Sequence, residues 1–524
     1  MKKKKIAIII GVVVVLVLVL GGVLFLNKDK LFKKDSNSTT SGEVEKKFVL
    51  ADYKMTGNDL QNFDLYFMQL ENNGKNKVYS PLSIKYALEM VGEGADGDSK
   101  TQIDSVIGDY VARKYTNSSH MSFANALFVR DSYKESVLDS YISTLKTTYG
   151  AEVIFDPFKS PEVINNWVSG KTFKLIPNLM DNVDGLDYVL VNALAIDMEW
   201  KNKIQSEHDD YRVRFPHEHV TIPKYDDFVT DSYSVISLDC AGYYPLKFKD
   251  VSYQVKSVEI AAVANRYDVI SEIGEDNIRK TVASEYDKWL KETEMDTSEE
   301  NFNIETYMKE IKSNYNHLST STDFLFYDDE NVKAFAKDLK TYDGVTLQYV
   351  GIMPKKQGLT DYIKNTDASE VNNVIANLKD IRLDSFEDGY MTIIGGYIPM
   401  FHLDYELDLK NDLKNLGITD IFDENKANLT KLSDGSYIDT AVHKANIDFS
   451  NEGIKAAAAT AMGGKGATDG GFDYFYDVPL IYIDLTFDNP YMYFVRDKET
   501  GEVWFAGTVY EPSEIQEEDF GGMN

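Results

Sequence analysis

The chain has 524 residues, of which 43% are hydrophobic and 27% charged, so neither a wholly disordered chain nor a multi-span membrane protein fits its composition. It carries 55 Lys and Arg against 85 Asp and Glu, and the formal charge of −30 argues against nucleic-acid binding. The single cysteine, Cys240, excludes an internal disulfide, a CxxC redox pair and a multi-cysteine zinc site.

The amino terminus has the pattern of a signal anchor. Lysines occupy positions 2–5, and residues 6–26 contain no charge. A helix of that length spans about 31 Å, enough to cross the hydrocarbon core of a membrane. The apolar run is too long for a cleaved signal peptide and lacks the polar face of a buried core helix. We therefore expect a cytoplasmic tail at 1–5, a single-pass transmembrane helix at 6–26, a polar stalk at 27–47 and the remaining chain outside the cell.

Beyond residue 47 the chain shows both helical and strand periodicities, which predicts a mixed α+β domain over 48–515 and an acidic tail at 516–524. Ser80 and Pro81 form a helix start, because Ser can cap a helix and Pro suits its first position. Strands are predicted at three further places, with a hairpin at the last: 189–191, 481–486, and 491–496 with 503–509.

Residues 206–319 differ in style from the rest of the domain. Two apolar stripes at helical spacing, within 278–289 and 304–315, flank an acidic segment at 292–303. We interpret this region as an insertion that contains a helical hairpin, and nothing in it indicates a cofactor.

Motifs for catalysis are scarce. The GxGxxG match at 92–97 follows a helix pattern, which favours a glycine-rich turn over a dinucleotide site. His217 and His219 could share a metal, but the sequence offers no third ligand. Cys240 has no recognisable partner base. The sequence therefore predicts a protein that is not an enzyme and needs no cofactor.

The segment 453–471 is unusual, because 12 of its 19 residues are Ala or Gly. A short buried alanine helix is one interpretation. The other is an extended strand, in which Ile454 and the even-numbered positions to 462 share one small or apolar face while Lys455 and Lys465 stay in solvent. Small side chains would let such a strand enter an existing sheet without overpacking it.

This segment and several other blocks, in the same order, resemble the serpins, the serine protease inhibitor superfamily. The residues that match the hinge of the family's reactive-centre loop are Glu452, Gly453, Ile454, Ala456, Ala457, Ala458, Ala459 and Thr460. Further matching blocks lie at 78–84, 190–193, 416–422, 441–445, 489–491 and 507–509.

The resemblance implies a fold with three β-sheets, about nine helices and an exposed loop at 453–471 that serves as bait. A target protease cleaves the loop and forms an acyl-enzyme, and the cut loop then inserts into the large sheet and distorts the protease. The resemblance also implies a hydrogen-bonded shutter beneath that sheet, made of Ser80, Ser83, Asn192 and His443. Trp200 would lie in the breach, at the top of the sheet.

The chain departs from the family pattern in places. Asn451 stands where the family usually has Glu, which puts a salt bridge in the breach in doubt. Ile454 replaces the usual Thr, and because it is uncharged we expect insertion to survive. The segment 467–490 is longer than usual, and the insertion at 206–319 has no family counterpart that we can assign.

The family spacing of fourteen residues from Gly453 places the scissile bond at Ala467–Thr468, with Lys465–Gly466 as the alternative. Alanine predicts an elastase-like or subtilisin-like target, and lysine a trypsin-like one. We expect a monomer at the cell surface that inhibits serine, or else cysteine, endopeptidases. A non-inhibitory serpin that acts as a binding or adhesion module is the other interpretation, and the four hinge alanines favour inhibition.

Overall fold

The computed structural model describes residues 50–204, 244–293, 303–314, 317–320, 324–454 and 479–515. The chain divides into two compact units, Met1–Phe48 and Val49–Asn524, and all described residues belong to the second. Within those ranges, no helix is long and apolar enough to cross a membrane. The predicted anchor at 6–26, the stalk and the acidic tail at 516–524 lie outside the described residues.

The largest sheet has seven strands in the order β1-β19-β18-β11-β10-β9-β12. Its hairpin of β18 and β19 confirms the hairpin predicted near the carboxyl end, and Gly501 takes a positive φ of 77° in the turn. The strands are β1 (Lys77–Tyr79), β9 (Leu325–Asp328), β10 (Val332–Asp338), β11 (Leu347–Pro354), β12 (Lys379–Asp380), β18 (Tyr491–Asp497) and β19 (Val503–Val509).

A second sheet of five strands runs in the order β17-β13-β7-β6, with β8 paired to β7. It is built on the long antiparallel pair of β7 and β13, in register from Asn265 opposite Met391 to Ser257 opposite Pro399. The strands are β6 (Tyr244–Lys247), β7 (Gln254–Asn265), β8 (His317–Thr320), β13 (Met391–Pro399) and β17 (Leu480–Asp484).

Two smaller sheets replace the single large sheet that the resemblance implied. One runs β3-β2-β4 and the other β14-β15-β16-β5. The chain passes from one to the other where β4 ends and β5 begins, at Asp197, and no pairing joins β4 to β15 within the described residues. The strands are β2 (Met121–Arg130), β3 (Glu152–Asp156), β4 (Tyr188–Ile196), β5 (Met198–Glu199), β14 (Phe401–Asp408), β15 (Val442–Phe449) and β16 (Gly453–Ile454). The expectation of three sheets is therefore wrong for this structure, because the strands expected to form one main sheet belong to two separate sheets.

The described residues also contain twelve α-helices, more than the nine or so expected, because α8–α10 lie in the region predicted as an insertion. The mixed α+β class is confirmed. The helices are α2 (Leu50–Tyr53), α3 (Asn62–Leu70), α4 (Pro81–Gly94), α5 (Gly97–Ile107), α6 (Asp139–Thr148), α7 (Glu162–Lys171), α8 (Val269–Ile273), α9 (Glu275–Thr293), α10 (Ile304–Asn314), α11 (Leu359–Asn365), α12 (Ala368–Ala376) and α13 (Leu409–Asn415), and the 3-10 turns are η1 (Asp131–Ser136), η2 (Leu383–Ser385) and η3 (Asp420–Phe422).

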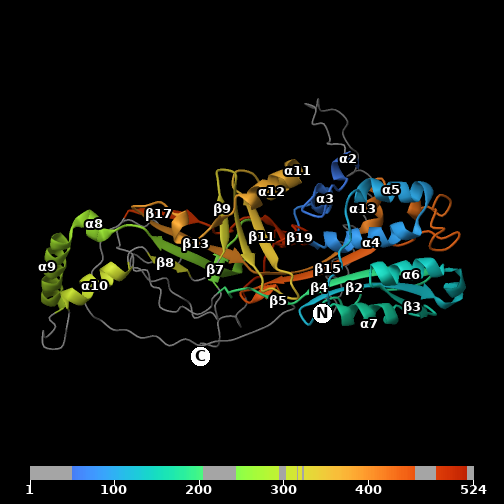
Figure 1. Cartoon of the computed structure of the whole chain (residues 1–524), viewed down its shortest axis with the longest axis horizontal. Coiled ribbons are helices and arrows are strands. Elements are labelled where there is room, and N and C mark those ends of the chain that lie inside the picture. Colours follow the sequence, from blue (N-terminus) through green and yellow to red (C-terminus); the bar gives the residue numbers. More distant parts are fainter. Residues whose placement is uncertain are drawn as a thin grey trace, which may run out of the picture. The chain divides into compact units, whose positions relative to one another are not determined.

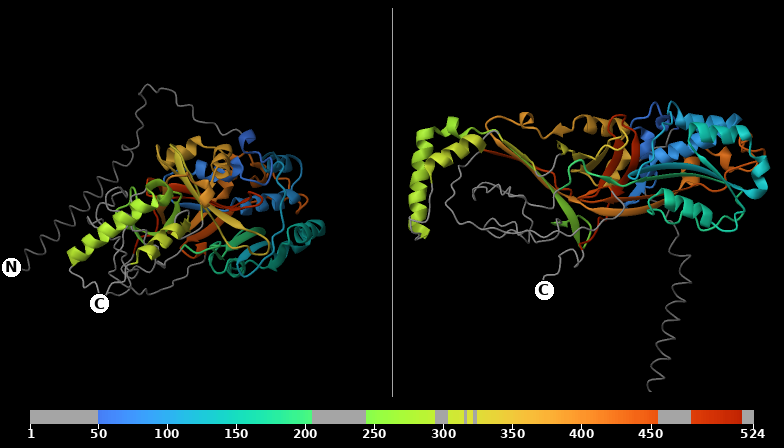
Figure 2. Two further views of the ribbon diagram at one scale, coloured as in Figure 1. Left: turned by 60° about the vertical axis from the view of Figure 1, so that its left-hand side comes forward. Right: turned by 60° about the horizontal axis from the view of Figure 1, so that its bottom comes forward.

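The region predicted as an insertion has two parts. Strands β6 and β7 belong to the five-stranded sheet, whereas α8, α9 and α10 lie together at the far end of β7 (Figures 1 and 2). The predicted helical hairpin is confirmed by α9 and α10, which Arg279 of α9 joins through an ion pair of 2.6 Å to Glu305. These helices enclose a small core of their own, separate from the main one, made of Val269, Ile278, Val282 and Met308.

The main core holds an ion pair that the sequence did not predict. Lys85 on α4 and Asp64 on α3 lie 2.6 Å apart, and both side chains are fully buried. The Lys85 ammonium also lies 5.9 Å from the ring centroid of Phe63 and 5.5 Å from that of Tyr110. Burial raises the pKa of the Asp64 carboxyl, and the Lys85 charge opposes that shift. The two charges depend on each other, since neither reaches water.

Candidate functional site

The predicted hinge begins as a strand inside a sheet. β16 lies between β15 and β5 and is antiparallel to both. Ile454 faces Phe449 on one side and Met198 on the other, and its side chain is 1% exposed. The inward phase predicted from the alternation therefore holds at its first residue. The rest of the hinge, Ala456, Ala457, Ala458, Ala459 and Thr460, lies outside the described residues.

Gly453 is required by the close approach of two backbones. A Cβ at this position would lie 2.1 Å from the carbonyl oxygen of Met198 and 2.7 Å from the Cα of Glu199. Both atoms belong to the backbone of β5, so no side-chain rotation could relieve the clash. Only glycine lets the chain enter the sheet here.

Trp200 contacts the residues just before the hinge glycine through both its backbone and its side chain. Its backbone N–H donates to the Glu452 carbonyl at 2.9 Å, and its indole Nε1 donates to the Ser450 carbonyl at 2.8 Å. The indole is fully buried, its ring centroid lies 5.5 Å from that of Phe449, and its backbone bridges to Leu339. Trp200, which the family resemblance assigns to the breach, thus contacts the chain immediately before the hinge glycine.

Two ion pairs flank Trp200 that the sequence reasoning missed. Lys203 pairs with Glu452 at 2.5 Å, and Lys340 pairs with Glu199 at 2.5 Å. Asn451 is buried, and its carbonyl accepts from the backbone N–H of Ile204 at 3.0 Å. The breach thus has ionic contacts although Asn451 has no charge. For the pair with Lys203, the sequence signal was Glu452, which stands one residue after the position where the family usually has Glu.

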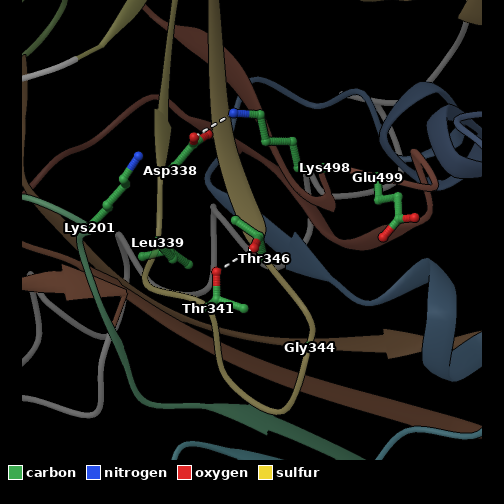
Figure 3. Close-up of a pocket in the computed structure, with 8 residues that line it drawn as sticks. All are labelled: Lys201, Asp338, Leu339, Thr341, Gly344, Thr346, Lys498 and Glu499. Carbon is green, nitrogen blue, oxygen red and sulfur yellow. Dashed lines mark hydrogen bonds and ion pairs between the residues drawn. The ribbon is translucent and has the colours of Figure 1, made fainter.

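A polar pocket of about 320 Å³ is lined in part by Leu339, the residue that forms a β-bridge with Trp200 (Figure 3). In it Lys498 pairs with Asp338 at 2.5 Å, and the hydroxyls of Thr341 and Thr346 lie 2.6 Å apart. Its two lysines and two carboxylates balance in charge, so the lining favours neither anions nor cations. The lining residues are Lys201, Asp338, Leu339, Thr341, Gly344, Thr346, Lys498 and Glu499.

Three of the four predicted shutter residues meet at the start of α4. Ser80 caps this helix, since its Oγ accepts from the backbone N–H of Ser83 at 3.1 Å. The backbone N–H of Ser80 donates to Nε2 of His443, on β15, at 2.9 Å. Burial lowers the pKa of the His443 imidazole to about 4, so the ring is neutral at pH 7 and can accept this bond.

The fourth predicted residue, Asn192, lies on β4 and has a different partner. Its Nδ2 donates to Oδ1 of Asn125 on β2 at 2.6 Å, and Asn125 in turn donates to the carbonyl of Tyr149 at 2.9 Å. Asn192 Oδ1 and Ser83 Oγ are both buried without a hydrogen-bond partner among the described residues. The predicted shutter residues therefore form two halves. Ser80, Ser83 and His443 meet at β15, and Asn192 lies on β4, which is not paired with β15 within the described residues.

The remaining predicted sites fall in two groups. Residues 92–97 form the junction of α4 and α5, which agrees with a glycine-rich turn. Within the described ranges, no group of three or more His, Cys, Asp and Glu residues could hold a metal ion. The others lie outside the described residues: His217, His219, Cys240, Lys465, Gly466, Ala467 and Thr468.

Comparisons with known proteins agree with this geometry. The profile of the family "Serpin (serine protease inhibitor)" matches residues 58–217 and 288–512. Neuroserpin of Mus musculus is 22% identical over 84% of this chain and 86% of its own length. The leukocyte elastase inhibitor of Homo sapiens is 23% identical over 86% of this chain and 97% of its own length. An uncharacterised serpin-like protein of Methanosarcina acetivorans is 23% identical over 86% of each chain.

Solved structures share the fold. Native tengpin, a thermophilic serpin, superposes with a TM-score of 0.55 at 18% identity, covering 91% of this chain and 97% of its own. Thyroxine-binding globulin in complex with thyroxine gives a TM-score of 0.55 at 17% identity, covering 89% of this chain and 98% of its own. The hinge strand, the buried Trp200 and the Ser80–His443 contact thus lie in a matching fold, and the chain belongs to the serpin family.

Proposed function

We propose that this protein inhibits serine endopeptidases by inserting its cleaved loop between β15 and the strand formed by β4 and β5. The observation that carries the proposal is β16, which already begins such a strand. Its Gly453 and Ile454 are paired on both edges, and the residues that follow in the sequence are small. Relatives that include the leukocyte elastase inhibitor and plasminogen activator inhibitor 1 support protease inhibition in general.

The register of β16 predicts which residues of β4 and β15 the rest of an inserted loop would lie opposite. Ile454 lies opposite Met198 and Phe449, and each step along an antiparallel pair moves one residue forward and one back. Continued in this register, Thr460 would arrive opposite Asn192 and His443 at once. Its hydroxyl would then lie between the two halves of the shutter, near the unpaired Asn192 Oδ1 and Ser83 Oγ. Because the same register places Thr460 opposite residues of both shutter halves, it supports insertion of a full strand.

The chemistry of the trap needs no catalytic group from the inhibitor. The protease serine Oγ bonds to the carbonyl carbon of Ala467, the C–N bond to Thr468 breaks, and Thr468 leaves with a protonated amine. The ester then joins the protease to the inserting chain. We assign the bond at Ala467–Thr468 to an elastase-like or subtilisin-like protease, with Lys465–Gly466 and a trypsin-like protease as the alternative.

An SDS-resistant adduct tests the proposal. The chain is mixed with elastase, subtilisin and trypsin, and the released carboxyl-terminal fragment is identified by mass spectrometry. We expect an adduct and a fragment that begins at Thr468. A fragment that begins at Gly466 would move the specificity to trypsin-like enzymes. Cleavage of the loop by these proteases without any adduct would refute inhibition and favour a non-inhibitory serpin.

We also propose that residues 6–26 hold the inhibitor at the outer face of a cell membrane as a monomer. The support is the length of the uncharged run and the four lysines before it. Fractionation of expressing cells tests this, with a chain that starts at residue 48 as the control. Full-length protein found only in the medium would contradict anchoring.

A further inference from the structure

Helix α4 is bonded to β15, one of the two strands between which the loop is proposed to insert. At its first turn, the backbone N–H of Ser80 donates to Nε2 of His443 on β15 at 2.9 Å. Its last two turns carry Glu89 and Glu93. The same helix contacts β4, the strand on the other side, and also α6 (Figure 1). The freedom of β4 to move away from β15 therefore depends on what joins the second half of α4 to the sheet that contains β4.

Tyr149, the residue directly after α6, makes one such connection. Its side chain is 5% exposed, and its hydroxyl lies 3.2 Å from Oε2 of Glu89 and 3.3 Å from Oε1 of Glu93, within hydrogen-bonding distance of both. The two glutamates are four residues apart, so their Cα atoms are separated by about 6 Å along the helix axis and their side chains lie on one face. The single phenolic proton thus has two carboxylate acceptors on neighbouring turns, and it keeps a partner if either carboxylate turns away.

The backbone carbonyl of Tyr149 is joined to β4. Nδ2 of Asn125 donates to this carbonyl at 2.9 Å, and Oδ1 of Asn125 accepts from Nδ2 of Asn192 at 2.6 Å. Asn125 and Asn192 lie opposite each other in the antiparallel pair of β2 and β4. When β4 moves away from β15, it therefore carries Asn125 and, through the bonded carbonyl, Tyr149. Glu89 and Glu93 stay on α4, which is bonded to β15.

We propose that Tyr149 is a positioning residue that restrains the sheet of β2, β3 and β4 against α4 and thereby slows the parting of β4 from β15. The inference rests on the proposed function. A strand that enters between β4 and β15 needs two strand spacings, about 10 Å, so β4 must move relative to α4. The hydrogen bonds from the Tyr149 hydroxyl to Glu89 and Glu93 break during that movement. An interaction that is present before the sheet opens and absent while it opens stabilises the starting state alone, and so lowers the rate of opening.

The ratio of trapped to cleaved inhibitor measures this rate. After acylation, insertion competes with hydrolysis of the ester, so faster opening of the sheet gives more adduct. Full-length protein in mild detergent is mixed with the protease that the wild type traps, under conditions in which part of the wild type is lost as cleaved product. We expect Tyr149→Phe to raise the ratio of adduct to cleaved product about fivefold, the factor that one hydrogen bond is worth. Its melting temperature should fall at the same time, and a merely structural role would not give more inhibition from a less stable protein.

Matched variants separate this hydrogen bond from a general loss of stability. Tyr66→Phe removes a buried phenolic hydroxyl that donates to the Asp412 carbonyl at 2.9 Å, and it should lower the melting temperature without changing the ratio. Glu89→Gln with Glu93→Gln keeps an acceptor oxygen at both positions and should behave as the wild type. Glu89→Ala with Glu93→Ala should match Tyr149→Phe. Either alanine alone should change the ratio little, because the other carboxylate still accepts.

Hydrogen exchange tests the restraint without a protease. The backbone amides of β4 should exchange faster in Tyr149→Phe than in the wild type or in Tyr66→Phe, because β4 parts from β15 more often. Wild-type exchange of β4 in Tyr149→Phe, or an unchanged ratio of adduct to cleaved product, overturns the proposal. A wild-type chain that forms no adduct refutes the proposed function instead, and the exchange of β4 then still decides whether Tyr149 restrains this strand.

Discussion

The backbone N–H of Ser80 and Nε2 of His443 form a hydrogen bond of 2.9 Å that joins the first turn of α4 to β15. The bond requires a neutral ring with its proton on Nδ1, because a protonated imidazole has no lone pair to accept it. The burial that lowers the pKa of His443 to about 4 therefore also maintains this contact at neutral pH.

The first prediction concerns the pH dependence of stability. The folded pKa of His443, about 4, lies below its ordinary value of 6.5, so its stabilising effect is complete above pH 6.5 and is lost as the pH falls towards 4. The loss amounts to about 3 kcal/mol at most. The melting temperature should fall over this range in the wild type and less steeply in His443→Gln. Equal slopes would contradict the assignment.

Asp412 should act in the opposite direction. Its carboxyl is 6% exposed, and burial, with the charges of Glu71 and Asp408, raises its pKa to about 7. Its contribution to stability is complete below the ordinary pKa of 3.8 and is lost as the pH rises through 7. Asp412→Asn should therefore raise the melting temperature by several degrees at pH 8 and leave it nearly unchanged at pH 4. Asp109→Asn, at an exposed carboxylate that is not among the charges acting on Asp412, is the control and should change neither value.

The ion pair of Lys85 and Asp64 gives a prediction about the core. Lys85→Met removes the cation paired with the fully buried Asp64 carboxylate and should cost about 3–5 kcal/mol of unfolding free energy. Adding Asp64→Leu should recover most of this loss, because the remaining charge is removed as well. Urea unfolding measures both. Lys100→Met, in the exposed pair with Asp104, should cost less than about 1 kcal/mol. A double variant no more stable than Lys85→Met would show that the pair is held for another reason.

Gly453→Ala tests the hinge. The new Cβ would meet the backbone of β5 at 2.1 Å, so the strand β16 should leave the sheet and insertion should slow. We expect more cleaved inhibitor and less adduct per molecule of protease, measured by gel densitometry. Gly170→Ala is the control, because nothing lies within 4 Å of its added Cβ. A wild-type ratio of adduct to cleaved inhibitor in Gly453→Ala would mean that β16 is not the start of the inserting strand.

Local sequence patterns predicted the features that depend only on residues close together in the chain. The Ser-Pro start of α4, the hairpin of β18 and β19, and the inward phase of Ile454 follow from capping, turn residues and alternation. The pair of Lys85 and Asp64 could not be foreseen, because it depends on how α3 packs against α4. The same holds for Asn192, whose partner Asn125 is 67 residues away, and for the parting of β4 from β15.

The separate core of α8, α9 and α10 has a mechanical consequence. Because Val269, Ile278, Val282 and Met308 pack apart from the main core, this module can unfold without exposing the interior of the main core. Its support is the long pair of β7 and β13, and β13 is also the neighbour of β17, the first described strand after the loop. A tensile load on the module would thus pass along β7 and β13 and reach β17, the strand that follows the proposed reactive-centre loop in the sequence.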